Sequence, residues 1–195
     1  MIPFIGLTGG IGAGKSTALD ALARLGAASL STDAVVHDLY GSADVRDAVV
    51  TRFGSGVLRD GAIDRAALAR LAFGPGDGRA WLEQLLWPRV GARVTAWRCE
   101  LEDQTPPPKV AVVEVPLLFE SGMEAIFDAT IAVITEEEIR HRRAAGRGHQ
   151  ALDERAARQL SQQEKSQRAT YTVVNDGTVA DLERKLSTIL ETLQK

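Results

Sequence analysis

The chain has 195 residues, of which 45% are hydrophobic and 25% charged, so it has room for one sizeable globular core and not for two full-sized domains. Its formal net charge of −3 excludes the broad positive footprint of a protein that binds nucleic acid or an anionic membrane, so any phosphate binding must be local. A single cysteine, Cys99, excludes an internal disulfide, and no apolar run approaches the roughly 20 residues that span a bilayer, so we expect a cytoplasmic protein.

The first predicted element is a buried parallel strand in residues 2–7, followed by a glycine-rich loop at residues 9–16. The loop fits the pattern G-x-x-x-x-G-K-[S/T] without a mismatch, between a strand and a helix as the pattern requires. Its glycines allow consecutive backbone N–H groups to converge on phosphate oxygens at a helix N-terminus. Lys15 would supply a point charge to the β- and γ-phosphates, and the Ser16 hydroxyl is placed to ligate Mg²⁺.

The helix after this loop has leucines at threefold spacing and ends at Gly26, a common helix cap. A short strand at 28–30 then delivers Asp33 to the carboxyl end of the predicted sheet. In an open parallel sheet this edge is where ligands bind. Asp33 could instead cap the helix predicted at 34–40, and the two roles could coexist.

Residues 34–102 have a helical pattern that is broken by glycines, most strongly at 74–78. Because this segment lies between two β-type segments, it predicts a helical insertion that forms its own lobe. The three tryptophans of the segment lie at helical spacing, which favours core packing over ligand platforms. Pro88 is expected to start or kink a helix.

A stiff linker at 105–108 leads to a strand at 110–115, and another strand follows at 129–134. Glu114 interrupts the first of these strands. A carboxylate at the end of a buried strand is costly unless it is paired or bound to a metal, so Glu114 is a functional candidate.

The strongly polar segment 136–167 predicts two helices around Gly146 and Gly148. Its arginines have two interpretations that stay open at this point: a solvated pair of charged helices, or an arginine-bearing lid that closes over phosphates. These arginines are Arg140, Arg142, Arg143, Arg147, Arg155 and Arg158. A last strand at 171–174 and an amphipathic helix after it close the pattern.

The alternation of strands and helices predicts a three-layer α/β nucleotide-binding core with a parallel sheet and right-handed crossovers. The sequence has no Asn-Lys-x-Asp segment and no Asp-x-x-Gly switch on a strand, which weakens a GTPase interpretation. Asp60 and Gly61 are placed in a turn between helical segments. An inserted lobe and an arginine-rich lid instead suit a small-molecule phosphotransferase, which must exclude water so that ATP is not hydrolysed.

Segments along almost the whole chain resemble, in the same order, the signature set of the dephospho-CoA kinase family. They are residues 6–17 (GLTGGIGAGKST), Thr32-Asp33, residues 60–65 (DGAIDR) and residues 116–120 (PLLFE). Residues 175–177 (NDG) are similar to the motif at the family's last strand. The phosphate loop alone would be unspecific, but the TGGIG opening together with PLLFE is highly specific.

The resemblance implies that the chain transfers the γ-phosphate of ATP, with Mg²⁺, to the ribose 3′-hydroxyl of dephospho-CoA in the last step of coenzyme A synthesis. It also implies a P-loop kinase domain like that of nucleoside monophosphate kinases. The core would lie at about 1–34, 106–135 and 169–195, a helical substrate lobe at about 35–105, and a helical lid at about 136–168.

The resemblance also implies roles for individual residues. Asp33 would hydrogen-bond the acceptor hydroxyl and take its proton, and Lys15 would be the second catalytic residue. The residues implied in ATP binding are Gly10, Gly12, Ala13, Gly14, Lys15, Ser16, Thr17, Arg140, Arg143 and Arg147. Those implied in acceptor binding are Thr8, Asp33, Arg65, Pro116, Leu117, Leu118, Phe119 and Glu120. Ser16 would ligate the metal, and Glu114 is a candidate for its outer coordination sphere.

The chain departs from the family pattern at three places. Ala144 stands where a second lid arginine is expected, with Arg143 and Arg147 on either side. Trp87 precedes Pro88 where the family usually has histidine, and Ser31 replaces an aspartate, which leaves Asp33 as the sole carboxylate there.

Two other functions stay open on the sequence: a related kinase for a nucleoside monophosphate or small metabolite, and a non-catalytic nucleotide-dependent switch. Neither the oligomeric state nor the preferred divalent ion follows from the sequence.

Overall fold

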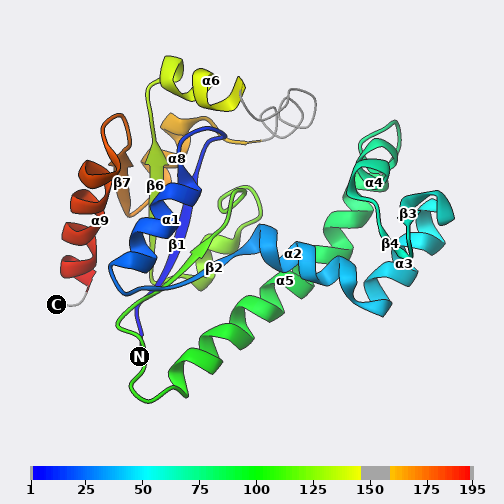
Figure 1. The fold of residues 1–195 in the computed structure, drawn as a ribbon, viewed down its shortest axis with the longest axis horizontal. Coiled ribbons are helices and arrows are strands. Elements are labelled where there is room, and N and C mark those ends of the chain that lie inside the picture. The colour runs from blue at the N-terminus through cyan, green and yellow to red at the C-terminus, as the bar shows by residue number, and fades with distance from the viewer. Residues whose placement is uncertain (1, 146–158, 194–195) are drawn as a thin grey trace. The chain divides into compact units, whose positions relative to one another are not determined.

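The computed structural model describes residues 2–145 and 159–193, and the chain forms two compact units (Figure 1). The sheet unit comprises Met1–Ser31 and Trp97–Lys195, and the helical unit comprises Thr32–Ala96. The helical unit ends within helix α5 (Gly78–Glu102), before the end of the lobe predicted at about 35–105. The division into core, lobe and lid stays a prediction.

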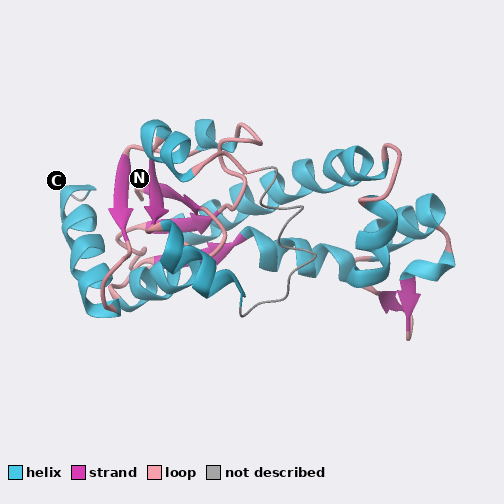
Figure 2. Ribbon diagram, turned by 90° about the horizontal axis from the view of Figure 1, so that it is seen from above, coloured by secondary structure: helices cyan, strands magenta, loops and turns pink. Residues whose placement is uncertain are grey.

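A parallel sheet with strand order β2-β5-β1-β6-β7 forms the centre of the sheet unit. Its strands are β1 (Phe4–Gly9), β2 (Ala28–Ser31), β5 (Ala111–Glu114), β6 (Ala129–Ile134) and β7 (Tyr171–Val174). The strands predicted at 129–134 and 171–174 are therefore confirmed. Helices cover both faces of this sheet (Figure 2), which confirms the predicted α/β layering.

Alternate residues of β1 pack on opposite faces of the sheet, because successive side chains of a strand point to opposite faces. Ile5 and Leu7 belong to the apolar core between the sheet and the helices α1 (Lys15–Arg24) and α9 (Val179–Leu193). Phe4 points to the other face, where its ring stacks on Phe127 with centroids 5.0 Å apart. The strand is buried along its whole length, which explains its continuous apolar sequence.

Shorter elements complete the sheet unit and surround the strand ends. They are the 3-10 turn η2 (Met123–Ile126) and the helices α6 (Glu137–Ala145) and α8 (Gln162–Arg168). The capping box of Ser161 and Glu164 fixes the start of α8, because each side chain accepts a backbone N–H that the helix leaves unpaired. Among the residues that the structure describes, no helix is long and apolar enough to cross a membrane.

The helical unit contains α2 (Thr32–Gly41), α3 (Ala43–Phe53), α4 (Arg65–Ala72) and the first part of α5. Val45, Val49 and Leu68 are at the centre of its own apolar core. The entirely helical pattern predicted for this segment is wrong at one place. A 3-10 turn η1 (Ser55–Val57) leads into a hairpin of β3 (Leu58–Arg59) and β4 (Ala62–Ile63).

The hairpin turn consists of Asp60 and Gly61, which both have positive φ angles, 53° and 79°. Two positive φ angles are the requirement of a tight type I′ hairpin turn, for which Asp-Gly is a preferred pair. The turn predicted at these residues is present, but it joins strands of only two residues and not helices.

The core packing predicted for the three tryptophans is wrong for Trp87, which is 40% exposed. Trp81 packs edge-on against Phe53 with ring centroids 5.6 Å apart, and Trp97 lies 6.3 Å from Phe4. Pro88 does not start a helix, because it lies inside α5, and the alternative that it kinks a helix stays a prediction.

A testable prediction concerns Asp128, which joins the beginnings of β1 and β6. The Phe4 N–H donates to Asp128 Oδ2 at 2.8 Å, and the Asp128 N–H donates to the Phe4 carbonyl, also at 2.8 Å. We expect Asp128→Ala to lower the free energy of unfolding by about 1 kcal/mol, because it removes the acceptor of a strand N–H group. Urea denaturation would measure the loss.

Asp128→Asn is the matched control, since it keeps an oxygen acceptor while removing the charge that faces Arg98 at 3.5 Å. Equal losses in the two variants would show that the Arg98 ion pair carries the effect and not the hydrogen bond.

Candidate nucleotide-binding site

The carboxyl ends of the parallel strands meet at one edge of the sheet, where the predicted site segments begin. In register, Leu7 of β1 lies opposite Glu114 of β5 and Ile131 of β6. The phosphate loop therefore starts at the same level as the segment 116–120 and the segment that leads into α6. Asn175, directly after β7, reaches the same edge. Such an edge is where open parallel sheets bind ligands.

Gly14 holds the phosphate loop in a conformation suited to an anion. Its φ of 93° lies in the left-handed region, and it caps α1 directly before Lys15. The first turn of α1 has no acidic residue, so the positive end of the helix dipole is not neutralised within that turn. Lys15 Nζ bends back over the loop and donates to the Gly10 carbonyl at 3.1 Å.

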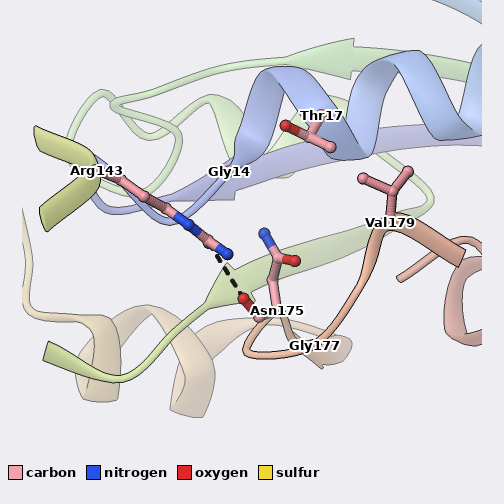
Figure 3. A pocket seen from close by; sticks show the side chains of 7 residues that line it. Gly14, Thr17, Arg143, Asn175, Gly177 and Val179 are labelled. Carbon is pink, nitrogen blue, oxygen red and sulfur yellow. Dashed lines mark hydrogen bonds between the residues drawn. The ribbon is translucent and has the colours of Figure 1, made fainter. Parts of the chain in front are cut away.

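A pocket of about 260 Å³ opens beside this loop (Figure 3). Its walls come from the phosphate loop with α1, from α6, and from the turn between β7 and α9. The lining residues are Gly12, Gly14, Thr17, Arg143, Asn175, Gly177 and Val179. One wall is thus aliphatic and glycine-rich while another carries a guanidinium and an amide, which suits a flat, polar-edged ring such as a nucleotide base.

Asn175 connects the pocket to the phosphate loop and is itself buried. Its side-chain N–H donates to the Ala13 carbonyl at 2.9 Å. Its own carbonyl accepts from Arg143 at 3.2 Å, the dashed contact of Figure 3, and from the Thr135 hydroxyl at 3.1 Å. A single residue therefore binds the loop, α6 and the end of β6 together.

Asp176 supports the same turn. The hydroxyl of Thr135 and the N–H of Glu136 donate to its carboxylate at 2.7 and 2.8 Å. These two hydrogen bonds hold the pKa of Asp176 below its ordinary value of 3.8, and the bond from the Thr135 hydroxyl has the larger effect. The carboxylate is therefore ionised at neutral pH.

Two of the three arginines implied in ATP binding lie next to the phosphate loop. The backbone and side chain of Arg140 approach Gly12 so closely that an added Cβ there would lie 2.6 Å from the Arg140 carbonyl oxygen. The Arg140 guanidinium is paired with Glu137. Arg143 lines the pocket, whereas Arg147 lies outside the described residues.

The segment Pro116–Glu120 follows β5, and its side chains are used largely inside the fold. Leu118 is fully buried and Phe119 is 5% exposed. Glu120 Oε1 accepts from Lys165 Nζ at 2.9 Å and from the Leu160 N–H at 2.8 Å. Pro116 and Leu117 are half-buried, and a role of this segment in acceptor binding stays a prediction.

Thr8 is also buried, and its hydroxyl lies 3.5 Å from the Pro116 carbonyl and 3.4 Å from Lys165 Nζ. Glu114 is the buried last residue of β5. Neither position contradicts a role near the substrates, and both roles stay predictions.

Asp33 and Arg65 belong to the helical unit, where both are exposed. Helix α2 already begins at Thr32, so Asp33 lies inside its first turn and the alternative that it caps this helix is wrong. Asp33 still follows the end of β2 by only two residues. Its meeting with the phosphate loop stays a prediction.

Sequence reasoning missed Lys165 and Gln159, which contact the loops of the site. Lys165 lies in α8 and is fully buried. Gln159 accepts from the Ile11 N–H of the phosphate loop at 3.2 Å. No motif singles them out, because both lie in the polar segment 136–167, whose composition predicts only a solvated pair of helices or an arginine-bearing lid.

Comparison with known proteins gives one consistent family. A family model described as dephospho-CoA kinase matches residues 3–181. The dephospho-CoA kinase of Moorella thermoacetica is 39% identical over 181 residues, which cover 89% of this chain and 84% of the relative. That of Protochlamydia amoebophila is 34% identical over 194 residues, which cover 97% of this chain and 96% of the relative.

A solved structure agrees with these relatives. Dephospho-CoA kinase from Campylobacter jejuni matches with a TM-score of 0.72 at 26% identity, covering 100% of this chain and 98% of that one. The family resemblance and the kinase fold predicted from the sequence are thereby confirmed.

A testable prediction concerns the space beside Gly14. A Cβ on Gly14 would lie 2.2 Å from the amide nitrogen of Asn175. We expect Gly14→Ala to weaken binding of an ATP analogue by about tenfold or more, because Asn175 and with it Arg143 would have to move. Isothermal titration calorimetry would measure the dissociation constant.

Gly26→Ala is the matched control. Gly26 has a similar φ of 90°, but a Cβ there would meet nothing within 4 Å. Both variants should lose about 1–2 kcal/mol of stability from the left-handed backbone, with a further loss in Gly14→Ala from the clash with Asn175. Only Gly14→Ala should lose nucleotide affinity. Equal affinities would contradict the role assigned to the Asn175 contact.

Proposed function

The chain belongs to the dephospho-CoA kinase family, and on this premise we propose how its residues transfer the γ-phosphoryl group of ATP to the ribose 3′-hydroxyl of dephospho-CoA, giving coenzyme A and ADP. One observation carries the proposal above the others. The phosphate loop and the pocket beside it are joined through Asn175, so one continuous surface can hold both ends of a nucleoside triphosphate.

On the donor side, the N–H groups of the loop and of the first turn of α1 would bind the phosphate oxygens. Lys15 would exchange its contact with the Gly10 carbonyl for the β- and γ-phosphates, whose charge is a stronger partner. The pocket would hold the base, with Thr17 and Val179 on its walls. Arg140, Arg143 and Arg147 would stabilise the charge that spreads over the transferring group.

Mg²⁺ fits the donor set at the loop. Among the described residues there is no group of three or more His, Cys, Asp or Glu side chains that could hold a metal ion. A Mg²⁺ ion in a kinase does not need such a group of side chains, because it keeps several water ligands and is bound by one or two protein oxygens together with the substrate phosphates. Ser16, in the first turn of α1, would supply the hydroxyl, and the bound ion would neutralise phosphate charge.

On the acceptor side, Asp33 would accept the proton of the 3′-hydroxyl as the oxygen attacks the γ-phosphorus. It is an exposed carboxylate in the first turn of α2, two residues after the end of β2, and no second acidic residue precedes it in Ser31-Thr32. The segment Pro116–Glu120, Thr8 and Arg65 would contact dephospho-CoA. We place the enzyme in the cytoplasm, which its single cysteine supports.

The reaction itself is tested by ADP release with ATP, Mg²⁺ and dephospho-CoA, with the product identified as coenzyme A by its mass. AMP, CMP and shikimate in place of dephospho-CoA test for a related small-molecule kinase. ADP release that no acceptor stimulates would instead indicate a nucleotide-dependent switch and would contradict the proposal.

A testable prediction separates the two sides of the site. We expect Asp33→Asn to lower kcat by about 10² to 10⁴ while the dissociation constant for ATP stays unchanged, because a general base contributes that much to the rate. Lys15→Ala should weaken ATP binding and slow the reaction together, because it removes the charge that holds the phosphates. Rapid-quench kinetics and calorimetry would measure both effects. Near-normal turnover in Asp33→Asn would end its assignment as the base.

A further inference from the structure

Lys165 is a fully buried charged side chain that the mechanism above does not use. Its ammonium reaches the Pro116 carbonyl at 2.8 Å, Glu120 Oε1 at 2.9 Å and the Thr8 hydroxyl at 3.4 Å. These partners are the end of β1 and both ends of the segment 116–120. One side chain from α8 thus holds the whole segment against the central strand.

Burying this ammonium costs free energy. Burial lowers the pKa of Lys165 from its ordinary value of 10.5, and the neighbouring Glu120 carboxylate opposes the shift. A buried ion pair often contributes no more stability than apolar residues of the same volume, whereas its directed contacts can fix one arrangement. The partners of Lys165 therefore indicate a role in placing the segment 116–120.

Gln159 makes a second connection to the same segment. Its side-chain N–H donates to the Pro116 carbonyl at 3.3 Å, and its oxygen accepts from the Ile11 N–H at 3.2 Å. The next residue, Leu160, donates its N–H to Glu120 at 2.8 Å. The residues around the start of α8 thereby join the phosphate loop to both ends of the segment 116–120.

We propose that Lys165 and Gln159 are positioning residues that fix the acceptor segment Pro116–Glu120 relative to the phosphate loop. Both act through the Pro116 carbonyl, on which their donors converge. The inference rests on the proposed function, because it takes the segment 116–120 to contact dephospho-CoA. A displacement of about 1 Å between reacting groups can cost about 100-fold in rate, so fixing this distance has catalytic value without contact to the substrates.

The main test is Lys165→Met, which keeps the length of the side chain and removes its hydrogen bonds. We expect kcat/KM for dephospho-CoA to fall by about 100-fold, with the loss in both KM and kcat. The dissociation constant for ATP should stay within about twofold, because ATP contacts the loop and the pocket and not the segment 116–120. Lys109→Met is the control, since Lys109 is an exposed lysine just before β5, at the opposite end of the strands.

A second variant avoids leaving Glu120 buried without its counter-ion, which could prevent folding. Glu120 Oε2 is buried and has no hydrogen-bond partner among the described residues, so this carboxylate depends on Lys165. Gln159→Met exposes no such charge. It should lower kcat/KM for dephospho-CoA in the same direction, by about tenfold, and the double variant should lose less than the product of the two single losses.

The outcomes separate the two proposals. If the wild-type enzyme makes no coenzyme A from dephospho-CoA, the proposed function and this inference both fail. A second outcome is that the wild-type enzyme is active, and that Gln159→Met and any folded Lys165→Met have the wild-type kcat and KM and only a lower Tm. Lys165 and Gln159 would then have a structural role only, and this inference alone would be overturned. Equal losses in dephospho-CoA turnover and ATP affinity would also overturn it, because they would indicate general damage to the site.

Discussion

The whole site depends on the register of β1 in the parallel sheet. This strand is buried on both faces, with Leu7 in the apolar core and Thr8 toward the Lys165 side. A slip by one residue would exchange these side chains, placing a hydroxyl in an apolar layer and leaving the Lys165 ammonium next to a leucine. Because the same register aligns Leu7 with Glu114, it also fixes the level at which the phosphate loop and the segment 116–120 begin. The packing of a single strand thus determines where the two loops stand.

Phosphate binding in this acidic chain is a local property. The net charge is −3, yet the loop gathers Lys15, Arg140 and Arg143 at the positive end of α1. Lys15 and Arg143 are held partly by backbone carbonyls, those of Gly10 and Asn175. A carbonyl orients a cation without neutralising it, so these two contacts do not cancel the charge of the side chains that make them. Arg140 is paired with Glu137, so a phosphate would have to compete with that carboxylate.

The parts of the fold that can be predicted from the sequence are those marked by a pattern in neighbouring residues. The phosphate loop has a motif, and the strands at 129–134 and 171–174 have short apolar runs bounded by polar residues. The β3–β4 hairpin had its signal in Asp60-Gly61, but strands of two residues give no periodicity to confirm it. The prediction of core packing was wrong for Trp87, because helical spacing identifies a helix without showing which side of it faces solvent. Lys165 could not be found at all, because its burial depends on partners 45 to 157 positions away.

The Lys165 contacts also show how a polar segment can take part in packing the loops of the site. Residues 159–168 are mostly charged or amide-bearing, which by composition predicts a solvated helix. Their polar groups instead satisfy backbone groups of the loops they touch: Ile11 N–H, Pro116 carbonyl and, through Gln162, the Thr135 N–H and carbonyl. Loops at a ligand-binding edge have backbone groups that no strand pairs, and each must find a partner when buried. A polar helix next to such an edge supplies those hydrogen-bond partners and so fixes the positions of the loops. An equally stable apolar helix would make no such hydrogen bonds and would leave these positions unfixed.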